Sequence, residues 1–168
     1  MRVLGVDPGL GCTGYGVIER AASKSGQWRS AAITVLEAGV IRPDRKDSLP
    51  QRLEHIHGAV SQLIERYRPG VLALEEIYSH YQHPKTAIIM AHARGVICLA
   101  AAAGRVKVIG YSARRVKQVT TGTGTATKEQ MQRAVQQLLG LLRRPAPHDV
   151  ADALALALTH IHMQKAAL

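Results

Sequence analysis

Residues 1–16 read MRVLGVDPGLGCTGYG and combine an apolar run, a carboxylate and a glycine-rich turn. The apolar run at residues 3–6 is typical of a short buried strand, and Asp7 follows it directly. Pro8 and Gly9 then stop the strand, and further glycines keep side chains away from the carboxylate. A buried strand with one acid at its end and a tight turn after it indicates a site for a metal or a phosphate.

The first part of the chain has the pattern of three short strands. Apolar and small residues predict strands at residues 2–7, 12–20 and 30–41, joined by a Pro-Gly turn and a polar loop. Three strands with short connections are expected to form an antiparallel meander.

Residues 49–67 change to a helical period, because apolar residues such as Ile56 and Val60 recur at three- and four-residue spacing. A fourth apolar strand follows at residues 71–74. A helix between two strands has the length of a crossover connection. Strand 71–74 is therefore expected to run parallel to strand 2–7, as its neighbour in the sheet.

The rest of the chain alternates helices with one more strand. The expected elements are helices at residues 85–103, 112–119, 128–142 and 148–163, a strand at 105–110 and a polar loop at 120–127. Thr127 and Gln130 have the spacing of a capping box. Helix 85–103 is apolar almost all round, so it is either central in the fold or covered by a partner, and in so small a protein a subunit contact is favoured. The pattern predicts one α/β domain over residues 1–168, with a mixed five-stranded sheet flanked by helices.

The positive charge lies in one segment. The net charge is +10, and residues 77–148 hold eleven Lys and Arg against one acid, while the remainder is balanced. A polyanion such as DNA or RNA is the expected partner, and a solvated basic face is the alternative. Two cysteines make no disulfide framework, and no run resembles a signal peptide or a membrane span. A cytoplasmic location is therefore expected.

Three more acids have positions like that of Asp7, at the ends of apolar elements. Either Glu75 or Glu76 ends the fourth strand, and only one of them can face the site because side chains alternate along a strand. Asp149 and Asp152 share one face in the first turn of the last helix. Four carboxylates together need cations, and such oxygen ligands suit Mg²⁺ or Mn²⁺. Beside a basic surface, they indicate two-metal phosphodiester hydrolysis.

Each of these residues also has a purely structural interpretation. Asp7 could start a turn, and Asp149 could cap a helix whose dipole Asp152 favours. Tyr78 could stack on an unpaired base or simply pack. His148 could protonate a leaving group or merely begin the helix. The hypothesis of a nuclease site rests on the combination of the acids and on no single residue.

The chain resembles the RuvC family of Holliday junction resolvases nearly from end to end. The segments that carry the resemblance are GVDPGLGCTGYGVIE at 5–19, ALEEIY at 73–78, ARGV at 93–96, ARRVKQ at 113–118, TGTGTATKEQ at 121–130 and HDVADALALALTH at 148–160. The first and last are specific, and their order and spacing strengthen the match. The resemblance implies a ribonuclease-H-like fold and a homodimer that cuts four-way DNA junctions in recombination and repair, with one of two symmetric nicks made by each subunit.

The resemblance also implies roles for individual residues. The catalytic, metal-binding acids would be Asp7, Glu75, Asp149 and Asp152, which favours Glu75 over Glu76. The DNA-binding residues would be Tyr78 and the basic residues Lys117 and Lys128, to which the basic character of helix 112–119 adds Arg114 and Arg115. The helix after Glu75 would form the dimer contact, and a branch-migration motor is a further expected partner.

The expected mechanism has Asp7 bridging two Mg²⁺ ions roughly 3.5–4 Å apart, with Mn²⁺ as a possible substitute. Glu75 and Asp152 would hold one ion each, and Asp149 would complete the shell or orient the water. Two alternatives remain open. An actin/Hsp70-like ATPase also places an acid and glycines after its first strand, although this chain is short for two such lobes. A non-catalytic junction-binding module would need the basic surface but not the four acids.

Overall fold

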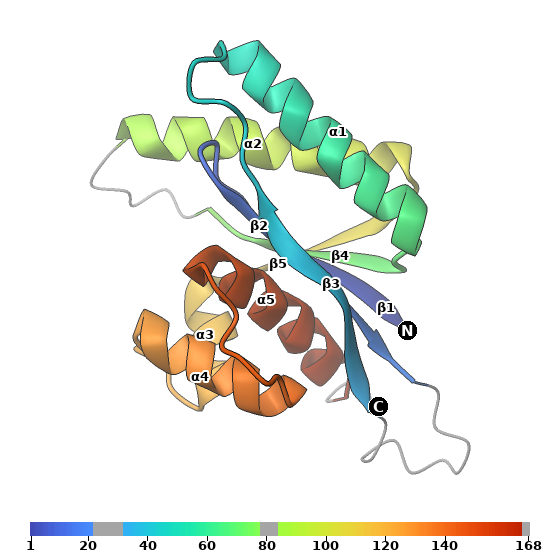
Figure 1. Cartoon of the computed structure of the whole chain (residues 1–168), viewed down its shortest axis with the longest axis vertical. Coiled ribbons are helices and arrows are strands. Elements are labelled where there is room, and N and C mark those ends of the chain that lie inside the picture. The colour runs from blue at the N-terminus through green and yellow to red at the C-terminus, as the bar shows by residue number, and fades with distance from the viewer. Residues whose placement is uncertain (22–31, 78–83, 166–168) are drawn as a thin grey trace.

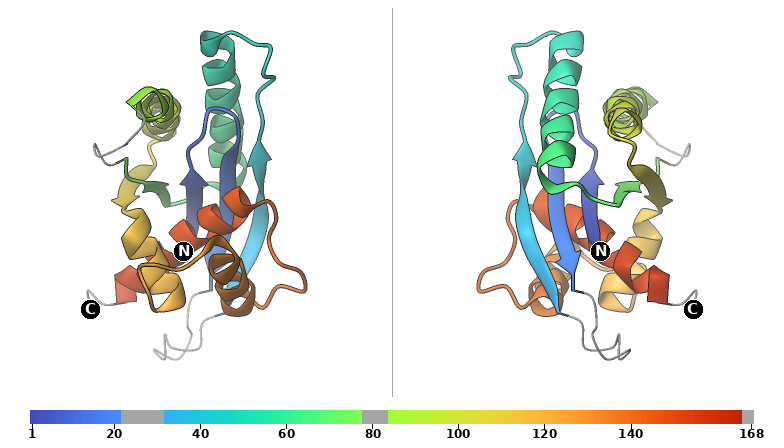
Figure 2. Two further views of the ribbon diagram at one scale, coloured as in Figure 1. Left: turned by 90° about the vertical axis from the view of Figure 1, so that its left-hand side faces the viewer. Right: turned by 90° about the vertical axis from the view of Figure 1, so that its right-hand side faces the viewer.

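The computed structural model describes residues 1–21, 32–77 and 84–165, and it has a central sheet between two layers of helices (Figures 1 and 2). The strands are β1 (Arg2–Asp7), β2 (Thr13–Arg20), β3 (Ile33–Ile41), β4 (Val71–Glu75) and β5 (Lys107–Tyr111). The helices are α1 (Leu49–Tyr67), α2 (Pro84–Ala103), α3 (Ala113–Thr121), α4 (Lys128–Leu139) and α5 (His148–Lys165). The strand order is β3-β2-β1-β4-β5, with β1, β2 and β3 antiparallel and β1, β4 and β5 parallel. The predicted mixed sheet is confirmed.

The two helical layers form separate cores on the two faces of the sheet. Helices α1 and α2 cover one face, and α5 lies across the other with α3 and α4 packed outside it (Figure 1). On β1, Val3 belongs to the core on the α5 side, whereas Leu4 and Val6 belong to the core beneath α1 and α2. Side chains alternate along a strand, so Asp7 faces the α5 side. The same alternation, with Ala73 facing α5, places Glu75 there as well.

Glycines on β1 and β2 allow α5 to pack directly against the backbone of the sheet. A Cβ added at Gly14 would lie 2.0 Å from the carbonyl oxygen of Asp149, and one at Gly5 would lie 2.0 Å from that of Ala153. Contacts this short are impossible for a side chain, so only glycine fits there. The glycines of the opening stretch therefore bring the first turn of α5, with its two acids, down onto the strand beside Asp7.

Gly14→Ala is expected to destabilise the protein by about 1–3 kcal/mol or more, because the new methyl group must push α5 off the sheet. Each kcal/mol corresponds to roughly 2–4 °C in melting temperature for a chain of this size. Gly11→Ala is the matched control, since a Cβ there would meet only the Arg52 side chain, at 4.0 Å. Thermal melts of both variants test this. Equal melting temperatures would contradict the close packing of α5.

Several boundaries differ from the sequence prediction for local reasons. Helix α4 ends at Leu139 and not at residue 142, because Gly140 adopts a left-handed conformation with φ 61° and caps it. Helix α3 continues to Thr121, and Gly122 (φ 82°) ends it in the same way, so the polar loop begins later than predicted. Part of the predicted strand 30–41 lies outside the described residues, and β3 begins at Ile33.

The remaining changes concern β5 and the end of α5. Strand β5 begins at Lys107 because Arg105 turns the chain with φ 56° after α2. Helix α5 extends to residue 165, and His160 does not lie in a frayed end as its position suggests. It is 2% exposed, and its Nδ1 lies 2.8 Å from the Tyr111 hydroxyl. Burial, together with the charge of Lys107, lowers the pKa of His160. The buried histidine thus joins α5 to β5.

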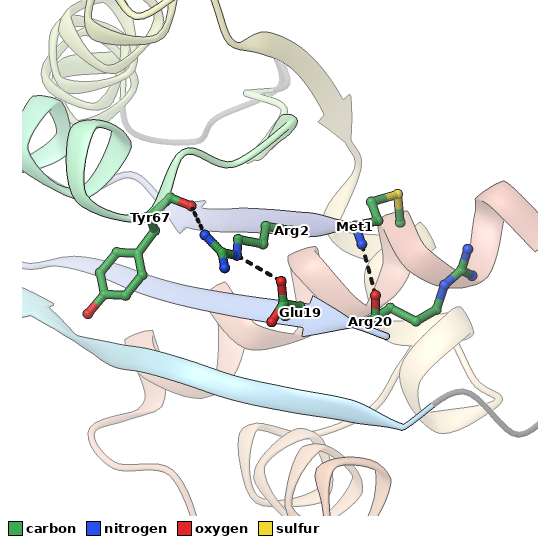
Figure 3. Close-up of polar contacts among 5 residues, drawn as sticks. All are labelled: Met1, Arg2, Glu19, Arg20 and Tyr67. Atoms are coloured by element: carbon green, nitrogen blue, oxygen red, sulfur yellow. Dashed lines mark hydrogen bonds and ion pairs between the residues drawn. The ribbon is translucent and has the colours of Figure 1, made fainter. Parts of the chain in front are cut away.

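Polar contacts hold the start of β1, at the sheet edge away from Asp7 (Figure 3). The Arg2 side chain donates to Glu19 Oε1 at 2.8 Å and to the carbonyl oxygen of Tyr67 at 3.0 Å. The N-terminal amine donates to the carbonyl oxygen of Arg20 at 2.8 Å. An exposed ion pair of this kind contributes at most about 1 kcal/mol. Its role here is to fasten β1 to β2 and to the end of α1.

Helix α2 is the one helix in the described part of the chain that is long and apolar enough to cross a membrane. The window Thr86–Ala103 has a mean hydropathy of 1.6, and 22% of it is buried. The expectation that no internal run resembles a membrane span is therefore wrong for this segment. One side of the helix, with Ala93 and Ile97, packs into the core, whereas Ile88 and Leu99 are 57% and 60% exposed. A subunit contact over this exposed side stays a prediction.

Candidate active site

Four acids from three elements meet at one edge of the sheet. Strands β1 and β4 are parallel with Val6 opposite Leu74, so the next residues, Asp7 and Glu75, leave the sheet side by side. The predicted parallel crossover is confirmed. Gly14 pairs with Asp7 in the sheet, and Asp149 lies directly over it at the start of α5. The charges of Asp149 and of Asp152, one turn further along α5, both raise the pKa of Asp7.

The proximity of the acids shifts their proton affinities. Burial raises the pKa of Asp7 to about 9, and the charge of Glu75, a hydrogen bond with Glu75 and the charges of Asp152 and Asp149 add to this. Burial and the charge of Glu75 raise the pKa of Asp152 to about 6, against the opposing charge of Lys128. A hydrogen bond between two carboxyl groups needs a proton. With its pKa raised to about 9, Asp7 carries this proton near neutral pH when no cation is bound.

Glu75 and Glu76 face opposite sides of the sheet, as alternation requires. Glu75 contacts Asp7, whereas the Glu76 side chain lies over Gly110 of β5, where an added Cβ would be 2.7 Å from Glu76 Oε1. Glu76 also lines a cavity of about 630 Å³ with residues of α2 such as Arg94. The sequence pattern left open which of the two faces the site, and strand β4 places Glu75 on the side of the other acids.

Two of the four predicted basic residues lie beside the acids. Lys117 of α3 lines a cavity of about 200 Å³ together with Glu75 and Asp152. Lys128 begins α4, and its positive charge lowers the pKa of Asp152. The predicted capping box fixes that helix start and is confirmed, with Gln130 accepting from the backbone of Thr127 at 2.8 Å and donating to its hydroxyl at 3.2 Å.

The other two predicted basic residues make contacts within the helical layer. Arg114 packs along Gly124, where an added Cβ would be 2.9 Å from its Cγ, and Arg115 donates to the Met163 sulfur at 3.1 Å. Tyr78 lies outside the described residues. His148 is close enough to Asp152 for its charge to lower the pKa of that acid, and its Nδ1 is buried with no partner among the described residues.

Two further side chains touch the backbone around the acids and were not predicted from the sequence. Arg94 of α2 donates from Nε to the carbonyl oxygen of Glu75 at 3.2 Å. Arg52 of α1 donates to the carbonyl oxygen of Leu10 at 2.9 Å and so holds the turn after Asp7. Both come from helices on the far side of the sheet, so no local pattern points to them.

Cys12 and Arg42 also reach the site, from the start of β2 and the end of β3. Burial raises the pKa of the Cys12 thiol, and so do the charge of Asp149 and a hydrogen bond with it. A hydrogen bond from Arg42 acts in the opposite direction. Arg42 lies outside the basic segment 77–148, so the charge pattern gave no sign of it.

The donor set fits a hard divalent cation by its chemistry. In the described ranges, no group of three or more His, Cys, Asp and Glu side chains is arranged to hold a metal ion as it lies. The acids nevertheless supply only carboxylate oxygens, which Mg²⁺ and Mn²⁺ prefer. Burial, and after it the charges of the neighbouring acids, raises the pKa of Asp7 and Asp152, and a bound cation would oppose both effects. A cation bound among these acids would displace the proton that Asp7 otherwise carries.

Clustered acids at the edge of a mixed sheet, bordered by two lysines, are typical of enzymes that hydrolyse phosphodiester bonds with divalent cations, so the fold and the site indicate a nuclease. The family described as "Crossover junction endodeoxyribonuclease RuvC" matches residues 3–160. A relative of that name from Rhodopirellula baltica is 48% identical over 93% of this chain and 83% of its own length.

Two solved structures of RuvC from Thermus thermophilus agree with this match. One is 32% identical with a TM-score of 0.86 and covers 99% of this chain and 97% of that one. The other, in complex with its Holliday junction substrate, is 33% identical with a TM-score of 0.87 and covers 99% and 96%. The chain therefore belongs to the RuvC family of crossover junction endodeoxyribonucleases. It is an enzyme that hydrolyses phosphodiester bonds in DNA junctions, and nucleases of this family are metal-dependent.

Proposed function

We propose that this chain resolves four-way DNA junctions as a homodimer, in which each subunit nicks one of two symmetric strands. The observation that supports this most directly is the meeting of four acids from β1, β4 and α5 beside two lysines. The catalytic residues of the proposal are Asp7, Glu75, Asp149 and Asp152. An ATPase is disfavoured because the chain belongs to a nuclease family, and a non-catalytic module would not need the acids.

The same four acids would hold the metal, which we propose to be two Mg²⁺ ions with Mn²⁺ as a substitute. Bound divalent cations at such a site activate a water and stabilise the departing 3′ oxygen. The chain's own residues hold the reacting strand: Lys117 and Lys128 border the acids and would bind the phosphates on either side of the cut. Contacts with phosphates read no sequence, so recognition of the junction would depend on the geometry of the dimer.

Cutting of a synthetic four-way junction tests the proposed function. With Mg²⁺ we expect two nicks at symmetric positions and products that a ligase can seal, and with EDTA no cutting. A linear duplex of the same sequence serves as the control substrate. If the junction stays intact with both Mg²⁺ and Mn²⁺, or if the duplex is cut equally well, the proposal is wrong.

Replacing Lys117 and Lys128 together by glutamine is expected to weaken junction binding by tenfold or more. Each lost phosphate contact should also reduce the slope of log affinity against log salt by roughly 0.9. Lys107→Gln is the matched control, because Lys107 begins β5 at the opposite edge of the sheet. Binding titrations at several salt concentrations measure both effects. An unchanged slope would mean that these lysines do not contact the DNA phosphates.

The proposed dimer contact uses the exposed side of α2. Ile88, Ile89 and Leu99 are 57%, 42% and 60% exposed, and such apolar area on one helix is best buried against a second copy. Leu99→Glu is expected to produce monomers in sedimentation experiments. Leu142→Glu, at a position that is 99% exposed between α4 and α5, should leave the assembly unchanged. If Leu99→Glu remains dimeric, the contact lies elsewhere.

Three further expectations accompany this proposal. The enzyme would act in the cytoplasm. Residues 1–168 would work as a single nuclease domain. A contact with a branch-migration motor stays a prediction without an assigned surface.

A further inference from the structure

The backbone of Glu75 is held by a side chain from the helices on the far side of the sheet. Arg94 of α2 donates from Nε to the carbonyl oxygen of Glu75 at 3.2 Å. At the other end of the same peptide group, the N–H of Glu76 donates to the carbonyl oxygen of Tyr111 on β5 at 2.9 Å. A trans peptide points its N–H and its carbonyl oxygen in opposite directions, so the oxygen of Glu75 points towards β1.

Strand β1 has no donor for this oxygen. The last pair between the two parallel strands is Val6 with Leu74, so Asp7 and Glu75 are next in register. In a parallel ladder the carbonyl oxygen of Glu75 would accept from the residue after Asp7. That residue is Pro8, which has no N–H. The proline that ends β1 therefore leaves this carbonyl without a partner in the sheet, and the guanidinium of α2 takes the place of the missing donor.

The two hydrogen bonds fix the plane of the peptide group that follows Glu75. A peptide group is rigid and planar, so partners at both its oxygen and its N–H set its orientation. The Glu75 side chain leaves the backbone directly before this group and contacts Asp7. Without the guanidinium, the carbonyl would turn towards water, and the direction of the Glu75 side chain would no longer be fixed.

The packing of α2 holds Arg94 in turn. Ala93 and Ile97, beside it on the helix, are both 0% exposed in the core beneath α1 and α2. The Arg94 side chain lines a cavity of about 630 Å³ together with Glu76, which faces away from the other acids. Its contact with Glu75 is to the backbone, so its effect on that acid passes through the main chain.

We infer that Arg94 is a positioning residue, which fixes the backbone at Glu75 and so holds the carboxylate of this acid in place for metal binding. This inference rests on the proposed function, because that proposal makes Glu75 a metal ligand. Groups that orient a metal ligand from behind typically contribute about 10–100-fold to metal affinity or activity.

Mn²⁺ binding by the full-length protein without DNA, measured by calorimetry, tests the inference. Arg94→Met keeps an unbranched side chain without a donor, and we expect it to bind Mn²⁺ about tenfold more weakly or worse. Arg94→Gln places an amide N–H at the position of Nε without the charge, and it should bind within about threefold of the original protein. Arg66→Met is the matched control, because Arg66 precedes Tyr67 at the opposite edge of the sheet. It should bind like the original.

Two further measurements separate positioning from a merely structural role. The melting temperature of Arg94→Met should fall by only roughly 2–4 °C, so the calorimetry is done on folded protein. A variant that lost stability alone would bind Mn²⁺ normally under these conditions. The single-turnover cutting rate of Arg94→Met should fall at limiting Mg²⁺ and recover at high Mg²⁺, and its junction affinity in EDTA should match that of the original protein.

The outcomes separate this inference from the function on which it rests. If Arg94→Met binds Mn²⁺ as the original protein does, or if Arg94→Gln is as defective as Arg94→Met, the hydrogen bond does not position Glu75 and the inference is wrong. Weaker junction binding in EDTA with unchanged Mn²⁺ binding would also overturn it, since Arg94 would then act on the DNA. Failure of the original protein to cut any junction would instead refute the proposed function. Weaker Mn²⁺ binding in Arg94→Met with recovery in Arg94→Gln supports the positioning role.

Discussion

Asp7→Asn is expected to lower the rate of junction cutting by about a thousandfold or more, which corresponds to roughly 4 kcal/mol of transition-state stabilisation. Asp7 lies between Glu75 on the neighbouring strand and the acids of α5, so its carboxylate is the one that all the others face. An amide has nearly the same shape but one oxygen and no charge. The variant should therefore fold and pack as before while losing the negative charge with which Asp7 would hold a cation.

Junction binding by Asp7→Asn should be retained, because the lysines that border the site are untouched and one repelling charge has been removed. Single-turnover cutting and a binding titration on the same junction separate the two effects. Glu76→Gln is the matched control, since that side chain lies on the other side of the sheet, over Gly110. Cutting at the original rate by Asp7→Asn, or an equal loss in Glu76→Gln, would contradict the assignment of the site.

The meeting of the four acids at one edge of the sheet was predictable because each of them follows local rules. Asp7 and Glu75 each follow a buried strand, and the helix between those strands forces them to be parallel. Asp149 and Asp152 are three residues apart at the start of a helix, so they share a face. Short-range periodicity and the handedness of crossovers are enough to bring such residues together.

The rest of the site depends on contacts between residues far apart in the sequence, which local patterns do not predict. Arg42 reaches Cys12 only through the register of β2 and β3, which includes a shift between Val17 and Ile18. His160 can be buried because its ring is hydrogen-bonded to the Tyr111 hydroxyl on β5, and no residue of the last helix indicates that partner. Contacts of this kind join elements far apart in the chain, so only the assembled fold can show them.

The raised pKa of Asp7 also predicts that, without bound metal, the folded protein becomes less stable as pH rises. The pKa of Asp7 is raised by burial and by Glu75, so the folded protein keeps a proton on this group that the unfolded chain has released above about pH 4. The folded state binds more protons, and stability must fall as pH rises towards the folded pKa of about 9. In EDTA the free energy of unfolding should fall by up to about 1.4 kcal/mol per pH unit, or roughly 3–5 °C in melting temperature.

The range pH 6.5 to 8.5 isolates this effect. The lowered pKa of His160 has the opposite effect, because below the ordinary histidine pKa of 6.5 the unfolded chain binds a proton more readily than the folded protein, and stability falls as pH falls. Above pH 6.5 His160 is mostly neutral in both states, so it adds little further change in stability with pH. Asp152, with a pKa of about 6, is mostly ionised throughout the range. Thermal melts in EDTA should therefore show a decline for the original protein and for Glu76→Gln, and a flat, higher profile for Asp7→Asn.

Added Mg²⁺ should remove the decline in the original protein, because a cation bound to the folded state replaces the proton that the acids otherwise need. It should leave Asp7→Asn nearly unchanged, since that variant lacks the charged carboxylate that would hold the cation. A flat profile for the original protein in EDTA would mean that neither burial nor the neighbouring acids raise the pKa of Asp7 in solution. A Mg²⁺-dependent rise in Asp7→Asn equal to that of the original protein would mean that the cation binds at another site.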